Sequence, residues 1–321
     1  ESLAINVFKD LSLKTPLIIF FASLLPLTIS RVLIYSLNGI KKIWQSNLLD
    51  QVLSITIVAL ILLAGLIFQF DLSVDKVAQY YLFARALVLI ITVIYWKKQF
   101  QFSISFNYKP ELKNMLTMAF PLLLVSSTSI IASNADTIMI GWLMDTKNVG
   151  LYSVAAKIAL LTSFILQVTN SAVSPRLAYM FDENKIEETQ RMVKQVSFFL
   201  AVIAIGFMVT AFFLGEFALS LWGMEFVTAY YPLLILCAGQ FFNISTGCAG
   251  LLLVMCGHEK ILGKISVISL LMNLGLNIIL IKHYGIIGAA IATAGVITVE
   301  NIMKVIIAKR KTGILSIPFS W

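Results

Sequence analysis

Residues 114–174 read NMLTMAFPLLLVSSTSIIASNADTIMIGWLMDTKNVGLYSVAAKIALLTSFILQVTNSAVS, two apolar segments joined by a short polar turn at Met144–Asn148. Each segment is long enough to cross a bilayer as an α-helix, which takes roughly 20 residues at ~1.5 Å each. One charge lies deep within each segment, Asp136 in the first and Lys157 in the second. Both charges lie ~15 Å from the turn, so we expect them at the same depth on neighbouring antiparallel helices.

Polar side chains recur around both charges at steps of three and four, the period of a helix face. In hydrocarbon such a face has to meet protein or water. Two interpretations stay open: Asp136 and Lys157 pair and hold two helices together, or the two faces line a water-filled central path. The polar residues are Ser126, Ser129, Ser133 and Thr137 on the first segment, and Ser153, Gln167, Ser171 and Ser174 on the second.

The composition predicts a polytopic membrane protein. The chain is 59% hydrophobic and 12% charged, about half the charged fraction of a soluble domain, and its mean hydropathy is +0.92. The three cysteines, Cys237, Cys248 and Cys256, fall in one apolar segment and indicate neither a disulfide framework nor a metal site. We expect no metal and no cofactor other than a coupling ion.

Hydropathy predicts three spans in an N-terminal part, residues 1–98, and six in a C-terminal lobe, residues 114–321. Between them, apolar and polar residues alternate from Phe100 to Tyr108, which predicts an extended cytoplasmic linker over residues 99–113. The nine expected spans are 15–38, 48–70, 77–96, 114–143, 149–175, 192–214, 229–256, 261–281 and 286–308.

The basic residues predict the orientation of these spans. Of the 24 lysines and arginines, fifteen fall in alternate loops on one side and five on the other, and the rest lie inside spans. The positive-inside rule places the first set, and with it the C-terminus, in the cytoplasm. The net charge of +8 is therefore a topology signal, and no nucleic-acid partner is expected.

An internal repeat relates the first three spans to the last three. Gly39-Ile40-Lys41-Lys42 after the first span recurs as Gly257-His258-Glu259-Lys260 after the seventh, at an offset of 218 residues. Shifting the second and third spans by the same offset places them on the eighth and ninth to within several residues. The fourth to sixth spans have no counterpart in this chain, so we expect three further helices upstream of Glu1.

Several stretches resemble the Wzx-like polysaccharide flippases of the multidrug/oligosaccharidyl-lipid/polysaccharide exporter superfamily, the MOP or MATE-like exporters. The first is Asp136-Thr-Ile-Met-Ile-Gly141, followed by Val149-Gly-Leu-Tyr152 and Ala155-Ala-Lys157. The others are Leu37-Asn-Gly-Ile-Lys-Lys42, Met255-Cys-Gly-His-Glu-Lys260 and Tyr284-Gly-Ile-Ile-Gly-Ala-Ala-Ile-Ala-Thr293. Together, these stretches span nearly the whole chain.

The resemblance implies a two-lobed bundle of twelve helices around a central cavity, of which this chain holds helices four to twelve. It implies a flippase that turns polyprenyl-diphosphate-linked oligosaccharide across the cytoplasmic, or inner, membrane by alternating access, for O-antigen, capsule or exopolysaccharide. A polymerase or glycosyltransferase of the same pathway would be the expected protein partner, besides membrane lipid. Helices that line the family's cavity are absent, which departs from the family pattern.

We expect a cationic position for the diphosphate within a polar cavity. The resemblance implies that Lys157 faces that cavity, and Arg85, which the repeat offset places beside Lys304, is a second candidate. Arg31 is expected to extend to the headgroups. The predicted cavity residues are Lys157, Arg85, Asp136, Gln167, Ser133 and Asn134.

Glu300 and Lys304 are four residues apart, which favours an ion pair on one helix face. The alternative is a carboxylate that responds to H⁺ or Na⁺, with Asp136, Glu300 and Lys304 as candidates for coupling. A cation-coupled multidrug or metabolite exporter of the same fold is the competing function. An enzyme is not expected, because no nucleophile–base pair, phosphate loop or metal cluster is visible.

Overall fold

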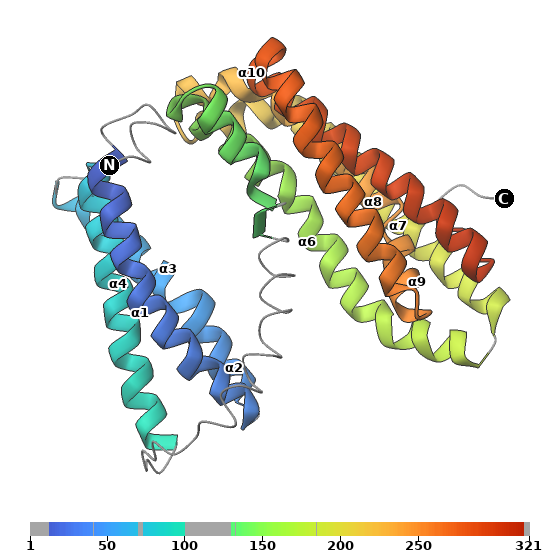
Figure 1. Ribbon diagram of the computed structural model, residues 1–321, viewed down its shortest axis with the longest axis horizontal. Coiled ribbons are helices and arrows are strands. Elements are labelled where there is room, and N and C mark those ends of the chain that lie inside the picture. Colours follow the sequence, from blue (N-terminus) through green and yellow to red (C-terminus); the bar gives the residue numbers. More distant parts are fainter. Residues whose placement is uncertain are drawn as a thin grey trace. The chain divides into compact units, whose positions relative to one another are not determined.

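The computed structural model describes residues 13–40, 42–69, 73–99, 130–131, 133–183 and 185–317. Within these ranges the regular elements are helices and no strand occurs. The chain divides into two compact units, Glu1–Pro121 and Leu122–Trp321, each described by itself. The helices (Figure 1) are α1 (Lys14–Gly39), α2 (Ile43–Asn47), the π-helical turn η3 (Leu48–Val52), α3 (Leu53–Ile67), α4 (Val74–Gln99), residues 130–143 with 132 left out, α6 (Thr146–Asp182), α7 (Ile186–Ser220), the 3₁₀ helix η4 (Met224–Ala229), α8 (Tyr230–Ser245), α9 (Cys248–Met255) and α10 (Glu259–Thr312).

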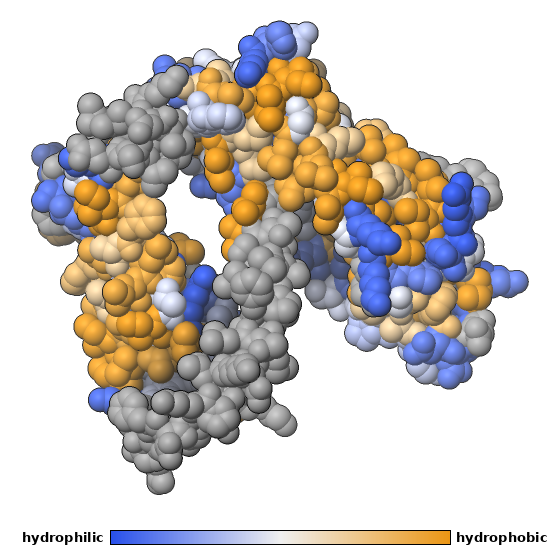
Figure 2. Space-filling model, viewed as in Figure 1, coloured by the Kyte–Doolittle hydropathy of each residue, from blue (hydrophilic) through white to orange (hydrophobic). Residues whose placement is uncertain are grey.

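Six described helices are long and apolar enough to cross a membrane, or up to seven if the pair at Trp44–Asp50 and Leu53–Ile67, bent by 43°, is one span. The number differs from nine because α10 contains both of the last two predicted spans, and because the span at 114–143 is described only from residue 130. Hydrophobic residues cover most of the described surface visible in Figure 2. The predicted all-α fold with several membrane spans is confirmed.

Two expected features fall outside the described residues. The linker at 99–113 lies there except for Gln99, which ends α4, and so do Ser126 and Ser129. Both therefore stay predictions.

In the N-terminal unit, α1 packs against α4 around the buried residues Ile34 and Leu37. The Trp96 indole donates a hydrogen bond of 2.6 Å to the Ser36 hydroxyl and ties the two helices together. Arg31, expected to extend to the headgroups, instead donates to Asp50 Oδ1 at 3.0 Å. The sequence analysis missed this pair, because Asp50 lies 19 residues along the chain, in η3 between α2 and α3.

The largest hydrophobic cluster of the C-terminal unit joins the helix at 133–143 with α6, α7, α8 and α10. Ile140 of the helix at 133–143, Tyr152 of α6, Leu233 of α8 and Ala289 of α10 are all buried in it. The predicted turn at Met144–Asn148 is present, since the Asp145 carboxylate accepts a 2.8 Å hydrogen bond from the Asn148 amide and caps α6.

The last helix, α10, turns back on itself at Gly285. The backbone there has φ 57° and ψ −137°, a conformation that a residue with a Cβ rarely adopts. Three residues on, a Cβ at Gly288 would overlap the backbone carbonyl of Leu280. Across the hairpin, Asn273 Nδ2 donates to Thr293 Oγ1 at 3.3 Å.

We expect Gly288→Ala to destabilise the protein by about 3 kcal/mol, because the hairpin has to open to admit a methyl group against a backbone carbonyl. The measurement is the thermal unfolding midpoint of the detergent-solubilised chain. Gly275→Ala, in the first half of α10 where a Cβ meets no atom within 4 Å, is the matched control. Equal midpoints for the two variants would show that the hairpin is not closed as described.

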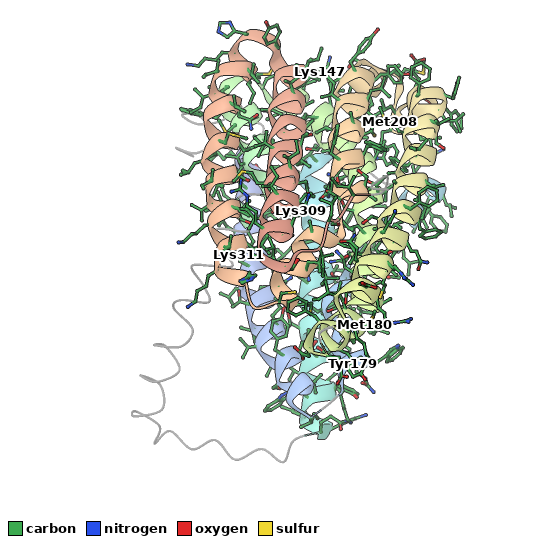
Figure 3. All side chains as sticks on the ribbon, turned by 90° about the vertical axis from the view of Figure 1, so that its right-hand side faces the viewer. Lys147, Tyr179, Met180, Met208, Lys309 and Lys311 are labelled. Atoms are coloured by element: carbon green, nitrogen blue, oxygen red, sulfur yellow. The ribbon has the colours of Figure 1, made fainter. Side chains whose placement is uncertain are left out.

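Basic side chains lie toward both ends of the C-terminal unit. Figure 3 shows Lys147 near one end and Lys309 and Lys311 toward the other. At that second end, two hydrogen bonds join the backbone after α10 to α7. Gln190 Nε2 donates to the Leu315 carbonyl at 2.8 Å, and the Leu315 backbone amide donates to Gln190 Oε1 at 2.7 Å.

Candidate functional site

The Asp136 carboxylate lies inside the C-terminal unit, where three side chains of two helices, α6 and α10, donate hydrogen bonds to it. Tyr152 of α6 donates at 2.9 Å, Asn277 of α10 at 2.8 Å and Thr293 of α10 at 2.5 Å. Asn277 is fully buried, and its own Oδ1 accepts no hydrogen bond from any described residue. The site around Asp136 therefore has more acceptor oxygens than donors among the described residues. Such a set of oxygens can bind a proton or a hard cation.

This cluster opens on a cavity of about 480 Å³ within the C-terminal unit. Two carboxylates, Asp136 and Glu300, line the cavity, and among the described residues no basic side chain does. The remaining polar lining residues are Ser133, Thr137, Tyr152, Gln240, Ser266, Ser269, Asn273 and Thr293.

At the edge of the cavity, Lys304 Nζ lies 2.7 Å from Glu300 Oε1, and both side chains are mostly shielded from solvent. The expected ion pair along one face of α10 is therefore present. Because a charge of opposite sign accompanies it, the Glu300 carboxylate is partly neutralised in place.

Lys157 does not pair with Asp136. Its side chain is exposed on the surface of the C-terminal unit and forms no ion pair with a described residue. The apolar residues next to it on this face, Leu161, Phe164 and Val168, are exposed as well. The interpretation in which the two charges hold neighbouring helices together is therefore wrong: neutral donors satisfy Asp136, and Lys157 extends away from the core.

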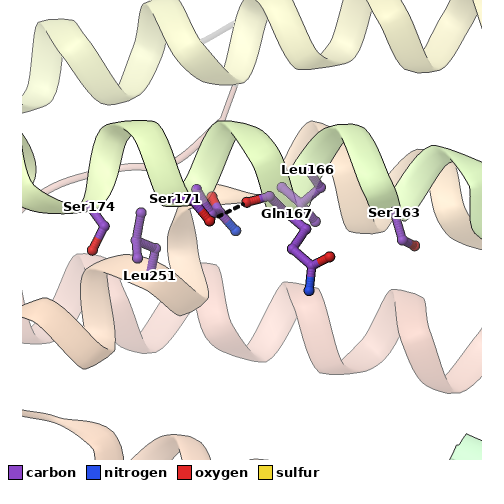
Figure 4. Close-up of a pocket in the computed structure, with 7 residues that line it drawn as sticks. Ser163, Leu166, Gln167, Ser171, Ser174 and Leu251 are labelled. Atoms are coloured by element: carbon purple, nitrogen blue, oxygen red, sulfur yellow. Dashed lines mark hydrogen bonds between the residues drawn. The ribbon is translucent and has the colours of Figure 1, made fainter. Parts of the chain in front are cut away.

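A second hollow follows α6 toward its C-terminal end, where it forms a groove of about 360 Å³ (Figure 4). Its described polar side chains are all neutral, and three of them, Gln167, Ser171 and Ser174, belong to the predicted polar face of this helix. Leu166 of α6 and Leu251 of α9 supply the apolar part of the lining. We call it the α6 groove, and its polar residues are Ser163, Gln167, Asn170, Ser171 and Ser174.

A chain of hydrogen bonds separates the cavity from the α6 groove. Ser163, which lines the groove, donates at 2.9 Å to Oε1 of Gln240, which lines the cavity. Asn243 donates to the same oxygen at 3.0 Å, and Asn301 of α10 donates to Asn243 at 3.3 Å. The two hollows therefore share a wall made of side chains.

The structure brings only some of the predicted site residues together. Ser133, Asp136 and Glu300 line the cavity, and Gln167 lines the α6 groove. Asn134 lines neither and donates to the backbone carbonyl of Ile130. Arg85 lies in the N-terminal unit, where its guanidinium donates to the Tyr81 hydroxyl one turn away.

The sequence analysis missed the residues that surround Asp136. Tyr152 and Thr293 fall within stretches quoted for the family resemblance, but no local pattern connects them to the carboxylate. Asn273 and Asn277 gave a usable signal, because two amides four residues apart inside a predicted span mark a polar helix face.

The chain matches two family models. The model described as polysaccharide biosynthesis protein covers residues 2–181, and the MatE model covers residues 121–279.

Curated relatives with related names are similar to parts of the chain. A probable low-salt glycan biosynthesis flippase of Haloferax volcanii is 26% identical over 169 residues, 52% of this chain and 36% of the relative. A capsular polysaccharide biosynthesis protein of Staphylococcus aureus is 24% identical over 204 residues, 63% and 52% of the two chains. A putative O-antigen transporter of Shigella flexneri is 23% identical over 214 residues, 66% and 50%.

The chain thus spans about half or less of the length of these relatives. The first family model nevertheless covers more than half of the chain, and the multiple apolar helices agree with it. This multi-pass membrane protein therefore belongs to the polysaccharide biosynthesis protein family.

Proposed function

We propose that the chain is part of a transporter, not an enzyme, that carries a lipid-linked glycan across the cytoplasmic membrane for the synthesis of a surface polysaccharide. The names of its relatives support a glycan flippase. The observation that carries the proposal is Lys157, an exposed cation that forms no ion pair with a described residue, ~15 Å along α6, on the same helix as the neutral α6 groove.

The substrate class follows from the chemistry of these two features. A polyprenyl-diphosphate-linked oligosaccharide presents an anion, a neutral polar glycan and a long apolar tail. A lysine exposed at mid-span costs free energy against hydrocarbon, about 2.5 to 3.5 kcal/mol on insertion scales. An anionic ligand that passes this point offsets that cost. The exposed apolar residues Leu161, Phe164 and Val168 beside Lys157 suit the tail.

The orientation follows the distribution of basic residues. The C-terminal ends of α6 and α10 are cytoplasmic, as the positive-inside rule requires, and the turn before α6 faces the other side. During transport, the polar face of α6 is exposed to the cytoplasmic side and to the opposite side of the membrane in alternation. A polymerase or glycosyltransferase that makes or consumes the lipid-linked glycan is the partner class.

Asp136 is the position that couples transport to an ion. It lines a cavity together with a second carboxylate, Glu300, and is bonded to Asn277, whose Oδ1 has no donor among the described residues. A Na⁺ ion or a proton would be held by Asp136, with Asn277 and Thr293 as neutral ligands or donors. Ion binding at Asp136 would be coupled to transport through the wall between the cavity and the α6 groove. The hydrogen bond from Ser163 to Gln240 is part of that wall.

The test is the location of the lipid-linked glycan in cells of the source organism with and without the gene. Without the chain, the intermediate should accumulate on the cytoplasmic leaflet and surface polysaccharide should fall. An unchanged distribution in the deletion strain, together with increased sensitivity to exported cationic dyes, would instead favour the cation-coupled exporter, for which the acidic cavity at Asp136 and Glu300 is the supporting observation.

A further inference from the structure

We infer that the α6 groove is the binding subsite for the sugar part of the lipid-linked substrate, and that it acts on the cytoplasmic side, before the anion reaches Lys157. This inference rests on the proposed function and adds to it where, and by which chemistry, the glycan is held. It concerns the groove residues Ser163, Gln167, Asn170, Ser171 and Ser174.

The groove has unused hydrogen-bonding capacity. The Asn170 Oδ1 atom is buried and has no donor among the described residues. The side-chain amide of Gln167 likewise makes no hydrogen bond within the part of the chain that the structure describes, and Figure 4 shows it extending from α6. A buried acceptor without a donor costs about 1 to 3 kcal/mol, so a ligand that brings donors stabilises this surface.

The three serine hydroxyl protons are already directed elsewhere. Ser163 donates to Gln240, Ser171 to the Gln167 carbonyl and Ser174 to the Met255 sulfur. Their oxygens remain as acceptors, beside two amides that both donate and accept. Sugar hydroxyls both donate and accept, so they match this set. A diphosphate does not, because none of the described residues that line the groove carries a charge.

The depth of the groove agrees with a substrate that enters from the cytoplasmic leaflet. Ser163 lies ~25 Å and Ser174 ~42 Å along α6 from its start at Thr146, whereas the hydrocarbon core is about 30 Å thick. The groove therefore runs from the inner edge of the hydrocarbon into the headgroup layer and beyond it. The glycan of an inner-leaflet lipid occupies this depth, and Lys157 lies deeper, near the middle of the membrane.

The test places a photoreactive benzophenone amino acid at one position at a time, in the protein expressed in its own host. Positions 167 and 171 of α6 lie in the groove. Position 161, on the exposed apolar face beside Lys157, reports on the path of the lipid tail, and position 202, exposed on α7 outside the groove, is the control. After irradiation, adducts with the host's lipid-linked glycan are detected by periodate oxidation and hydrazide labelling of the sugar. We expect sugar-bearing adducts at 167 and 171 and none at 202.

The outcomes separate this inference from the proposed function. Sugar-bearing adducts at 161 alone, or equally at 202, overturn the subsite and leave the flippase intact. Absence of such adducts at all four positions overturns the subsite and also contradicts the proposed function. In parallel, Gln167→Leu should lower surface polysaccharide about fivefold, as loss of roughly one neutral hydrogen bond predicts, whereas Val202→Leu, on the exposed face of α7, should leave it unchanged.

Discussion

Replacing Lys157 with alanine should lower surface polysaccharide at least tenfold and leave lipid-linked glycan on the cytoplasmic leaflet. The expected size follows from a hydrogen bond between a charged group and an anion, which contributes about 1.5 to 3 kcal/mol. Lys157→Arg should retain most of the activity because it keeps the charge. Lys157→Glu should abolish it, because a carboxylate repels the diphosphate.

Stability distinguishes a transport defect from a folding defect in this experiment. Lys157 is exposed and makes no ion pair with a described residue, so Lys157→Ala should leave the unfolding midpoint unchanged or slightly higher. Lys147→Ala removes an exposed lysine ten residues earlier, within the first turn of α6, and serves as the control. If the two alanine variants transport equally well, Lys157 has no role in binding the diphosphate.

Replacing Asp136 with asparagine should remove the response of the protein to its coupling ion. If that ion is Na⁺, the wild type should be stabilised by NaCl relative to choline chloride, by about 2.7 kcal/mol at an ion concentration 100 times its Kd. Asp136→Asn should lose this stabilisation, because the site then lacks its negative charge. The measurement is thermal unfolding of the solubilised chain in a titration of each salt.

The control for this variant is Glu216→Gln, which neutralises an exposed carboxylate on α7 outside the cavity. It should respond to Na⁺ like the wild type. A wild type that is insensitive to Na⁺ but changes stability with pH, with the change lost in Asp136→Asn, would identify the ion as a proton. Identical responses of Asp136→Asn and the wild type to both ions would remove Asp136 from the coupling mechanism.

Local sequence patterns predicted the parts of this structure that depend on near neighbours. Apolar runs marked the helices, and the turn at Met144–Asn148 was recognisable because Asp145 is a good helix cap. The pair Glu300–Lys304 is likewise a four-residue spacing on one helix. The neutral face of α6 was visible as a period, and most of it lines the groove in the structure.

The environment of Asp136 could not be predicted in this way. Its partners Asn277 and Thr293 lie 141 and 157 residues further along the chain, and only the packing of α10 against the helix at 133–143 brings them together. Equal depth suggested Lys157 as the partner of Asp136. Depth fixes the position of a residue along a helix but not the direction of its side chain, and that direction separates the two charges.

The hairpin at Gly285 has a consequence for biogenesis. The chain reverses there within a few residues, 282–285, which include Lys282 and His283, so we expect the two halves of α10 to leave the translocon together as one helical pair. The hydrogen bond from Asn273 to Thr293 then joins the two halves. Asn277 and Thr293 are synthesised 141 and 157 residues after Asp136, so we expect the carboxylate to gain these two donors only once the hairpin has been inserted.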